Sequence, residues 1–198
     1  MVIGSNNSLT YLKASNIWLK FRHLFTKCQE KPYDEQYNYW GVRFFDFRLF
    51  IHNNSLMVKN NVYKYPLSSL YRIMDFFNSR NDVVLRITLD ASASDAKKHN
   101  YQDIENKFNS TCKILESIYG NIVFCGGTRK FDNKQVYNFE KKESNYGDME
   151  IISPAEWSLI YRFITKWMPH FIGKLNSKYI EKFKDKHVFL VLNYVNRR

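Results

Sequence analysis

The sequence predicts an α/β fold, built as a small, trimmed or distorted (β/α) barrel of the TIM type. Segments with strand character alternate with segments whose apolar residues recur every three or four positions, which is typical of a mainly parallel sheet covered by helices. The clearest strand, residues 82–90, is apolar and β-branched enough to be covered on both faces. A full barrel typically takes about 250 residues, whereas this chain has 198. We therefore expect some outer helices to be reduced or lost.

The length and the 44% hydrophobic content suit one well-buried core, so we expect a single domain over residues 1–198. An open doubly wound sheet is the alternative architecture, but no glycine-rich phosphate loop follows the first strand. The three cysteines lack the spacing of metal ligands. No apolar run is long enough to span a bilayer, and the amino terminus lacks the layout of a secretory signal, so an intracellular location is expected.

The first part of the chain begins with a short strand at residues 2–5. Apolar residues at three- and four-residue intervals then predict an amphipathic helix over about 10–28, which the proline-containing segment 29–32 ends. A short helical turn at 33–40 stops at Gly41, because glycine commonly follows the last turn of a helix.

The next segment, residues 42–51, is almost continuously apolar and aromatic, which predicts a buried strand. A turn separates it from a second extended piece at 56–58. Pro66 suits the first turn of a helix over 66–78, and the strand at 82–90 follows.

A polar loop at 91–100 leads to a helix over 101–119. Its expected inward residues are Ile104, Phe108, Cys112, Ile114 and Leu115. A strand at 121–125 comes next, and the polar segment 128–147 is expected to be mostly loop, with an optional strand at 136–139.

The last part of the chain starts with a strand at 150–152 and a helix that opens on a capping box at Ser153. The expected apolar face of that helix contains Trp157, Ile160, Phe163, Ile164 and Trp167. A basic helix over 172–184 and a strong terminal strand at 187–195 complete the chain.

Two motifs in this order carry a family resemblance. Gly4-Ser-Asn-Asn-Ser8 is followed by Gly41-Val-Arg-Phe-Phe-Asp-Phe-Arg48, in which Arg43, Asp46 and Arg48 interrupt an otherwise apolar strand. Such charges need a partner or a site. The pair of motifs resembles the phosphatidylinositol-specific phospholipase C superfamily, which opens on Gly-Thr-His-Asp-Ser or Ser-His-Asn and continues with Gly-Ile-Arg-x-Phe-Asp-Ile-Arg. The resemblance implies a phospholipase C-like barrel that covers most of the chain.

The resemblance also implies a chemistry that this chain lacks the residues to perform. Members of the family use two histidines as general base and general acid. The first histidine falls on Asn6 with Asn7 beside it, and the second falls near Lys59 or Asn60. An aspartate expected on the final strand falls on Asn193. Because an amide neither gains nor loses a proton at useful pH, we expect no catalytic residues at these positions.

Arg48 matches the arginine that neutralises the phosphate in the bacterial branch of the family, where the eukaryotic branch uses calcium. A guanidinium suits a phosphate because of its forked donors. With Arg48 in place of an acidic residue, the resemblance implies no metal, and we expect no cofactor. Two interpretations of Asp46 and Arg48 stay open: a structural ion pair, or the remnant of an anion site.

For the histidines and for two of the tryptophans, we expect structural or surface positions and no catalytic or lipid-binding role. We expect Trp157 and Trp167 to be core or contact aromatics rather than a lipid-binding rim. The histidines lie away from the motif positions and are expected to be surface or helix residues; they are His23, His52, His99, His170 and His187.

The leading hypothesis is a catalytically inactive phospholipase C-like protein, repurposed as a structural, self-assembling or binding protein. Its abundant Asn, Lys, Tyr, Phe and Ile are typical of AT-rich genomes, which is compatible with a virus, an intracellular parasite or a low-GC bacterium. Within the hypothesis, the expected setting is a viral particle or a viral inclusion in the host cell. We expect a homo-oligomer or ordered assembly, with weak binding of anions or phospholipid headgroups. One alternative is an active metal-independent phosphodiesterase that uses Lys59 with His52. Another follows from the net charge of +11: a basic module for membranes or, less favoured, nucleic acid.

Overall fold

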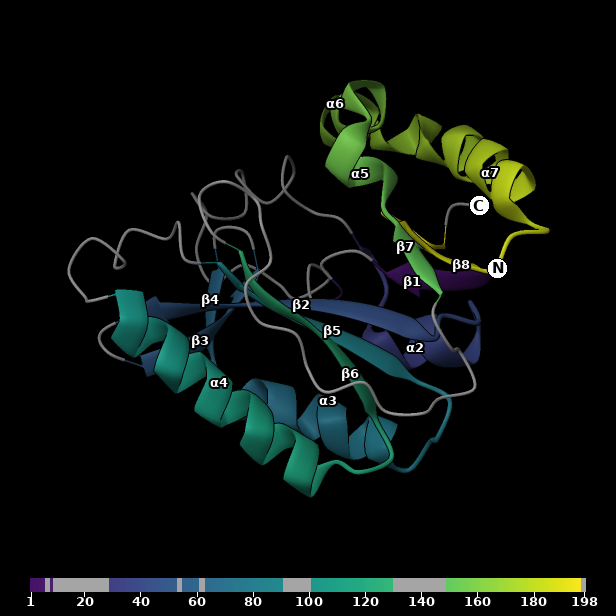
Figure 1. Cartoon of the computed structure of the whole chain (residues 1–198). Coiled ribbons are helices and arrows are strands. Elements are labelled where there is room, and N and C mark those ends of the chain that lie inside the picture. Colours follow the sequence, from purple (N-terminus) through teal and green to yellow (C-terminus); the bar gives the residue numbers. More distant parts are fainter. Residues whose placement is uncertain are drawn as a thin grey trace. The chain divides into compact units, whose positions relative to one another are not determined.

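The computed structural model describes residues 1–5, 8, 29–52, 55–60, 63–90, 101–129 and 149–196 of the chain (Figure 1). The helix expected over 10–28, the loop at 91–100 and the strand at 136–139 lie outside the described residues. Within the chain two compact units are distinguished. Unit 1 is Met1–Asp46, Asn61–Tyr63 and Asn145–Arg198, and unit 2 is Phe47–Asn60 and Lys64–Ser144. A single domain over 1–198 stays a prediction.

The described strands confirm the α/β class. They form one sheet of eight strands, hydrogen-bonded in the order β4-β3-β2-β1-β8-β7, with β5 paired to β2 and β6 paired to β5. The strands are β1 (Val2–Ser5), β2 (Phe44–His52), β3 (Ser55–Asn60), β4 (Tyr63–Pro66), β5 (Val84–Asp90), β6 (Val123–Arg129), β7 (Glu150–Ile152) and β8 (Val188–Leu192). None of these pairings between the described strands closes the sheet into a barrel, so barrel closure stays a prediction.

Strand β2 is the hub of the hydrogen-bonding pattern. Its first residues pair in parallel with β1, with Gly4 opposite Phe44, and its last five pair antiparallel with β3. It also pairs with β5. A strand with so many neighbours has little access to water, and its side chains are buried from Phe44 to Ile51 except for the half-buried Arg48.

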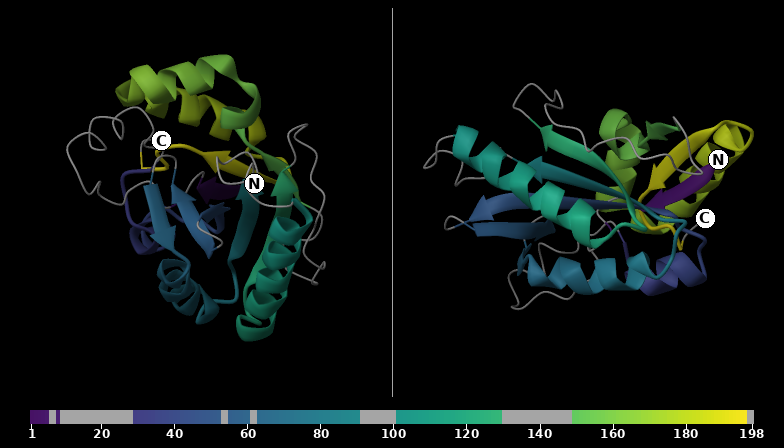
Figure 2. Two further views of the ribbon diagram at one scale, coloured as in Figure 1. Left: turned by 90° about the vertical axis from the view of Figure 1, so that its left-hand side faces the viewer. Right: turned by 60° about the horizontal axis from the view of Figure 1, so that its bottom comes forward.

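Unit 1 is built around the parallel strands β1, β8 and β7, with Val2 opposite Phe189 and Glu150 opposite Val188. All five residues of β8 are buried, as expected of a parallel strand covered on both faces. The helices of this unit are α2 (Tyr33–Asn38), α5 (Pro154–Trp157), α6 (Leu159–Trp167) and α7 (Ile172–Phe183), and the 3-10 turn η2 (Pro169–Phe171) joins the last two. Helix α7 packs on β8, and α6 packs on α7 (Figures 1 and 2).

Unit 2 contains the parallel pair β5 and β6, with Val84 opposite Val123, and the helices α3 (Ser68–Asn78) and α4 (Tyr101–Ile118) (Figure 2). Helix α3 buries the expected stripe of Leu70, Ile73, Met74 and Phe77. Just after α4, the Tyr119 hydroxyl donates to Asp75 Oδ1 of α3 at 3.2 Å. This bond links the ends of the two helices.

Three local expectations are wrong. Ile114 of α4 is 52% exposed rather than inward. Cys112 and Leu115 define the buried face of the helix, and Ile114, which directly precedes Leu115, points in a different direction because a turn takes about 3.6 residues. Pro66 ends β4 instead of opening a helix, and α3 begins at Ser68. The helix expected from Ser153 is broken at Ser158, whose extended backbone separates α5 from α6.

The first motif glycine should be indispensable for packing. A Cβ at Gly4 would lie 2.9 Å from Val191 Cγ2 and 3.0 Å from Phe44 Cδ1, so Gly4→Ala should destabilise the protein by about 1–3 kcal/mol. Gly120→Ala is the matched control, because a Cβ there meets nothing within 4 Å. Denaturant unfolding of both variants measures the effect, and an equal change in both would contradict the packing argument.

The Tyr119 hydroxyl should make the stability depend on alkaline pH. Burial first, and then the hydrogen bond to Asp75, raises the pKa of Tyr119 from 10.0 to about 12. A raised folded-state pKa means that the stabilisation is complete below pH 10 and is lost as the pH rises through 12. The difference in unfolding free energy between the wild type and Tyr119→Phe should therefore shrink over this range; a difference independent of pH would contradict the assignment.

Candidate functional site at the carboxyl ends of β8, β1 and β2

The candidate site lies in unit 1, where three parallel strands end at one edge of the sheet. Ser5, the last residue of β1, is opposite Phe45 on one side and Leu192 on the other. The residues that come next on the flanking strands are Asp46 and Asn193. The structure thus brings two of the sequence-predicted residues to either side of the end of β1, at the edge where α/β sheets bind ligands.

Ser8 joins the end of β1 to β2 at this edge. Its backbone N–H donates to the Asp46 carbonyl at 3.0 Å, and its Oγ accepts from the Asp46 N–H at 3.0 Å. The same hydroxyl donates to the Ser5 carbonyl at 2.8 Å, and Ser8 is fully buried. The final serine of the first motif is therefore a structural residue that fixes the turn after β1.

Asn193 lies in a buried network of hydroxyls and amides. Its side-chain Nδ2 donates to Thr165 Oγ1 at 3.2 Å, and its backbone N–H donates to the Tyr161 hydroxyl at 2.9 Å. That hydroxyl donates in turn to Asn176 Oδ1 at 2.8 Å, and Asn176 Nδ2 donates to the carbonyl of Asn193 at 3.0 Å. Asn193 is only 3% exposed. These bonds tie the end of β8 to α6 and α7.

The turn after β8 has an uncommon backbone. Tyr194 has a φ of 49°, in the left-handed region that non-glycine residues seldom adopt, so surrounding contacts must hold it there. The buried Gln29 supplies two of them: its Nε2 donates to the Leu192 carbonyl at 2.8 Å, and its Oε1 accepts from the Val195 N–H at 3.1 Å. Asn176 Nδ2 also donates to the Tyr194 carbonyl, at 3.3 Å.

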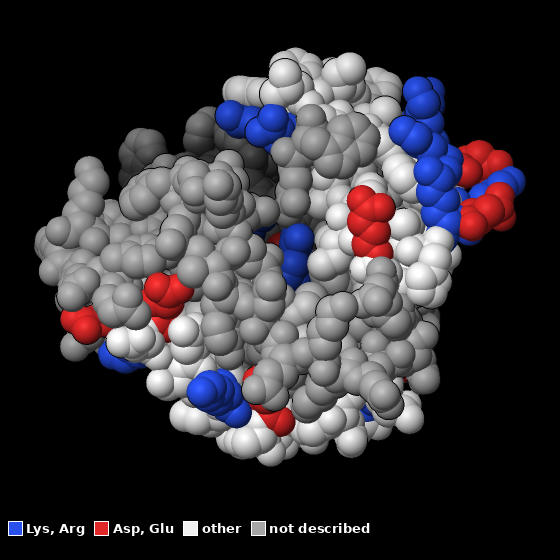
Figure 3. Space-filling view, in the orientation of Figure 1, with Lys and Arg blue, Asp and Glu red and all other residues white. Residues whose placement is uncertain are grey.

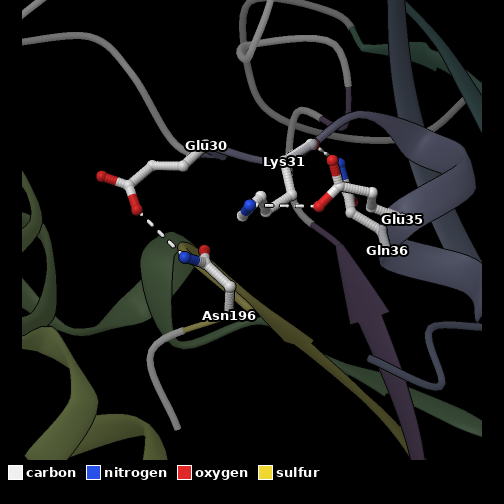
Figure 4. A network of polar contacts seen from close by, with 5 residues as sticks. All are labelled: Glu30, Lys31, Glu35, Gln36 and Asn196. Atoms are coloured by element: carbon white, nitrogen blue, oxygen red, sulfur yellow. Dashed lines mark hydrogen bonds and ion pairs between the residues drawn. The ribbon is translucent and has the colours of Figure 1, made fainter. Parts of the chain in front are cut away.

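The segment that follows Gln29 extends these contacts (Figure 4). Asn196 Nδ2 donates to Glu30 Oε2 at 3.0 Å, and Lys31 forms an ion pair with Glu35 at 3.1 Å. The buried Gln36 donates from Nε2 to the Lys31 carbonyl and, at 3.3 Å, to the Ser8 carbonyl. Residues 29–36 therefore support both the turn after β1 and the turn after β8.

The first charge of the second motif is accounted for by a structural contact. Arg43 donates from its guanidinium to the Tyr37 carbonyl at 2.9 Å and stacks over the Tyr37 ring at 3.9 Å. It thereby satisfies a carbonyl near the end of α2, where a positive charge is favourable. Arg43 is explained without a ligand.

Arg48 belongs to unit 2. It is half-buried and has Lys59 as its register partner on β3, next to the position of Asn60. The side chains of Lys59 and Asn60 lie outside the described part of the chain. Asp46 and Arg48 are two residues apart on β2, so they share one face of the strand. Both interpretations of this pair, a structural ion pair and the remnant of an anion site, stay predictions.

The other predicted positions lie either outside the described residues or elsewhere in the fold. Asn6, Asn7, His23 and His99 lie outside the described residues. His52 ends β2, 6.1 Å from the Phe50 ring, whereas His170 and His187 are exposed. Within the described ranges, no group of three or more His, Cys, Asp or Glu side chains could hold a metal ion. No helix among the described residues combines the length and apolar character needed to cross a membrane.

The comparisons with known proteins give one likeness. No protein-family model and no curated protein sequence matches the chain. Among solved structures, the phosphatidylinositol-specific phospholipase C from Listeria monocytogenes matches with a TM-score of 0.55 and 9% identity. The alignment covers 100% of this chain and 92% of that protein. The fold is similar to that of a bacterial phospholipase C. At this identity the likeness concerns the fold alone, and replacement of the catalytic histidines stays a prediction.

Sequence reasoning missed most of the residues that build this edge. They are Gln29, Gln36, Tyr161, Thr165 and Asn176. Each is a common polar residue without a motif, and its partner lies elsewhere in the sequence; Gln29 and Leu192 are 163 positions apart.

Removal of the Tyr161 hydroxyl should be costly. Tyr161→Phe leaves the Asn193 N–H and Asn176 Oδ1 without this buried partner, so we expect a loss of about 2–4 kcal/mol in unfolding free energy. Tyr39→Phe is the control, since Tyr39 is 79% exposed and the change should be within about 0.5 kcal/mol. Similar stabilities of the two variants would show that the network contributes little.

Proposed function

We propose that the chain is a phospholipase C-like protein without catalytic competence, built on a trimmed (β/α) barrel, that works as a structural, self-assembling or binding protein. Its composition is compatible with the viral origin that we favour. The likeness of its fold to a bacterial phospholipase C over the whole chain supports the barrel. The edge where β8, β1 and β2 end is then the position of the lost active site.

The proposal rests on the burial and the hydrogen bonds of Asn193. The resemblance assigns an aspartate to this position, where a carboxylate could orient a catalytic histidine. Here the amide is 3% exposed and donates to Thr165, while the Asn193 backbone binds Tyr161 and Asn176. A neutral amide neither gains nor loses a proton at useful pH, so it cannot act as a general acid or base. Its hydrogen bonds support a structural role in place of a catalytic one.

The rival function is a metal-independent phosphodiesterase that uses Lys59 with His52. It would need both groups near one phosphate, with Arg48 to neutralise its charge. The register supports only a part of this arrangement: Lys59 is opposite Arg48, whereas His52 lies at the far end of β2, opposite Ser55. Residues four apart in a strand are separated by about 13 Å. A shared phosphate between Lys59 and His52 is therefore disfavoured.

The deciding experiment is an assay of phosphatidylinositol cleavage by the full chain. We expect no inositol phosphate or cyclic inositol phosphate above the level given by Arg48→Ala, while a bacterial phospholipase C releases both under the same conditions. Product release by the wild type that Arg48→Ala abolishes would establish an enzyme and overturn the proposal. Circular dichroism of both chains ensures that the comparison concerns folded protein.

A further inference from the structure

Helix α6 turns its apolar side outward. Leu159, Ile160, Phe163 and Trp167 are 74%, 68%, 55% and 54% exposed, and Phe171 just beyond the helix is 46% exposed. Leu159, Phe163 and Trp167 are four residues apart, so they form one stripe along the helix. A surface helix normally buries such a stripe against the core. Exposed apolar residues that gather in one place mark a surface used for interaction.

The opposite side of α6 is polar and buried. Tyr161 and Thr165 face inward, where they bind Asn176 and Asn193. Rotation of the helix to bury its apolar stripe would break these hydrogen bonds and leave their buried partners unpaired, at a cost of several kcal/mol. The outward stripe is therefore imposed by the structure and is not a loosely packed core.

A basic edge borders the stripe. Arg162 and Lys166 are exposed one turn apart on α6, and Lys166 Nζ lies 4.9 Å from the Trp167 ring centroid. Helix α6 contains no acidic residue. On α7 three lysines recur every four residues, all of them exposed: Lys174, Lys178 and Lys182. Figure 3 shows Lys and Arg atoms over the region of α7, with Asp and Glu atoms beside them.

We propose that α6 is a docking surface for a membrane that carries anionic lipids, with the helix lying in the interface. Aromatic and aliphatic side chains would enter the boundary between headgroups and acyl chains, where tryptophan is favoured. Arg162 and Lys166 would reach the phosphates and carboxylates of the headgroups. This arrangement of apolar stripe and cationic edge is complementary to an anionic bilayer in both polarity and charge.

The charge argues against a second copy as the occupant. A symmetric dimer would bring the patches of two copies together, and α6 contains no acidic residue that could pair with Arg162 and Lys166 of the other copy. The proposal rests on the proposed function only in naming a binding role, and it involves neither Arg48 nor any cleavage reaction.

Vesicle flotation of the full chain tests the apolar stripe. The wild type should float with phosphatidylcholine vesicles that contain phosphatidylserine, and only weakly with phosphatidylcholine alone. The double variant Phe163→Ser, Trp167→Ser should bind about tenfold or more weakly, since two exposed aromatic side chains no longer enter the interface. The matched control is Ile114→Ser, Ile118→Ser on α4, which removes side chains 52% and 56% exposed and should leave binding unchanged.

A second pair of variants tests the cationic edge. Arg162→Gln, Lys166→Gln should weaken binding to the anionic vesicles by about tenfold or more at low salt, and added salt should weaken wild-type binding in the same direction. Lys107→Gln, Lys113→Gln on the exposed side of α4 is the control of equal charge, and should change binding much less. Trp167→Phe should retain binding but lose most of the blue shift in tryptophan fluorescence that vesicles produce.

Several outcomes would overturn the proposal. One is wild-type protein that stays unbound with anionic vesicles; another is a control pair that lowers binding as much as the α6 pair. Self-association that the Phe163→Ser, Trp167→Ser change abolishes, without vesicle binding, would assign the surface to a second copy. Each variant should have the same far-ultraviolet circular dichroism spectrum and the same unfolding midpoint as the wild type, so that a change in binding does not result from misfolding. Phosphodiesterase activity would contradict the proposed function, but it would not contradict the inference that α6 binds vesicles.

Discussion

Burial of β2 is the constraint on which the rest of the fold depends. The strand pairs with β1, β3 and β5, so its backbone is satisfied within the sheet and almost all its side chains leave water. Such a strand can carry charge only where something compensates it. Arg43, just before the strand, does so by binding Tyr37, and the backbone of Asp46 is held by Ser8. Arg43 therefore has a structural reason that does not require a substrate, whereas the contacts with Ser8 explain only the backbone of Asp46.

The edge at the ends of β8, β1 and β2 is a scaffold of neutral hydrogen bonds. Gln29 and Gln36 support the turns after β8 and β1, while Tyr161, Thr165 and Asn176 bind around Asn193. The same bonds fix the rotation of α6. By holding Tyr161 and Thr165 inward, they place Phe163 and Trp167 outside. The edge assigned to a lost active site thus also orients the surface that we assign to membrane binding.

Much of the element order could be predicted from the sequence because it rests on local patterns. The apolar runs that became β2, β5 and β8 and the buried stripe of α3 are evident without a structure. Errors arose where two local signals competed. Ser153 and Pro154 are a good helix start, yet the Ser153 side chain makes no capping bond, and Ser158 caps α6 instead by accepting from the Tyr161 N–H. The expected helix therefore became two.

By itself the sequence determined the α/β class and pointed to a phospholipase C-like fold, which the similar solved structure supports; that amides occupy the family's catalytic positions is still a prediction. It also determined that α6 has an apolar side, since that follows from spacing alone. Only the tertiary structure decided which side of α6 faces inward. The reason is that Asn176 and Asn193, which bind its polar side, are distant in sequence and come into reach when α7 and β8 pack. Hydrogen bonds between distant residues, which no local pattern encodes, override the usual burial of an apolar stripe.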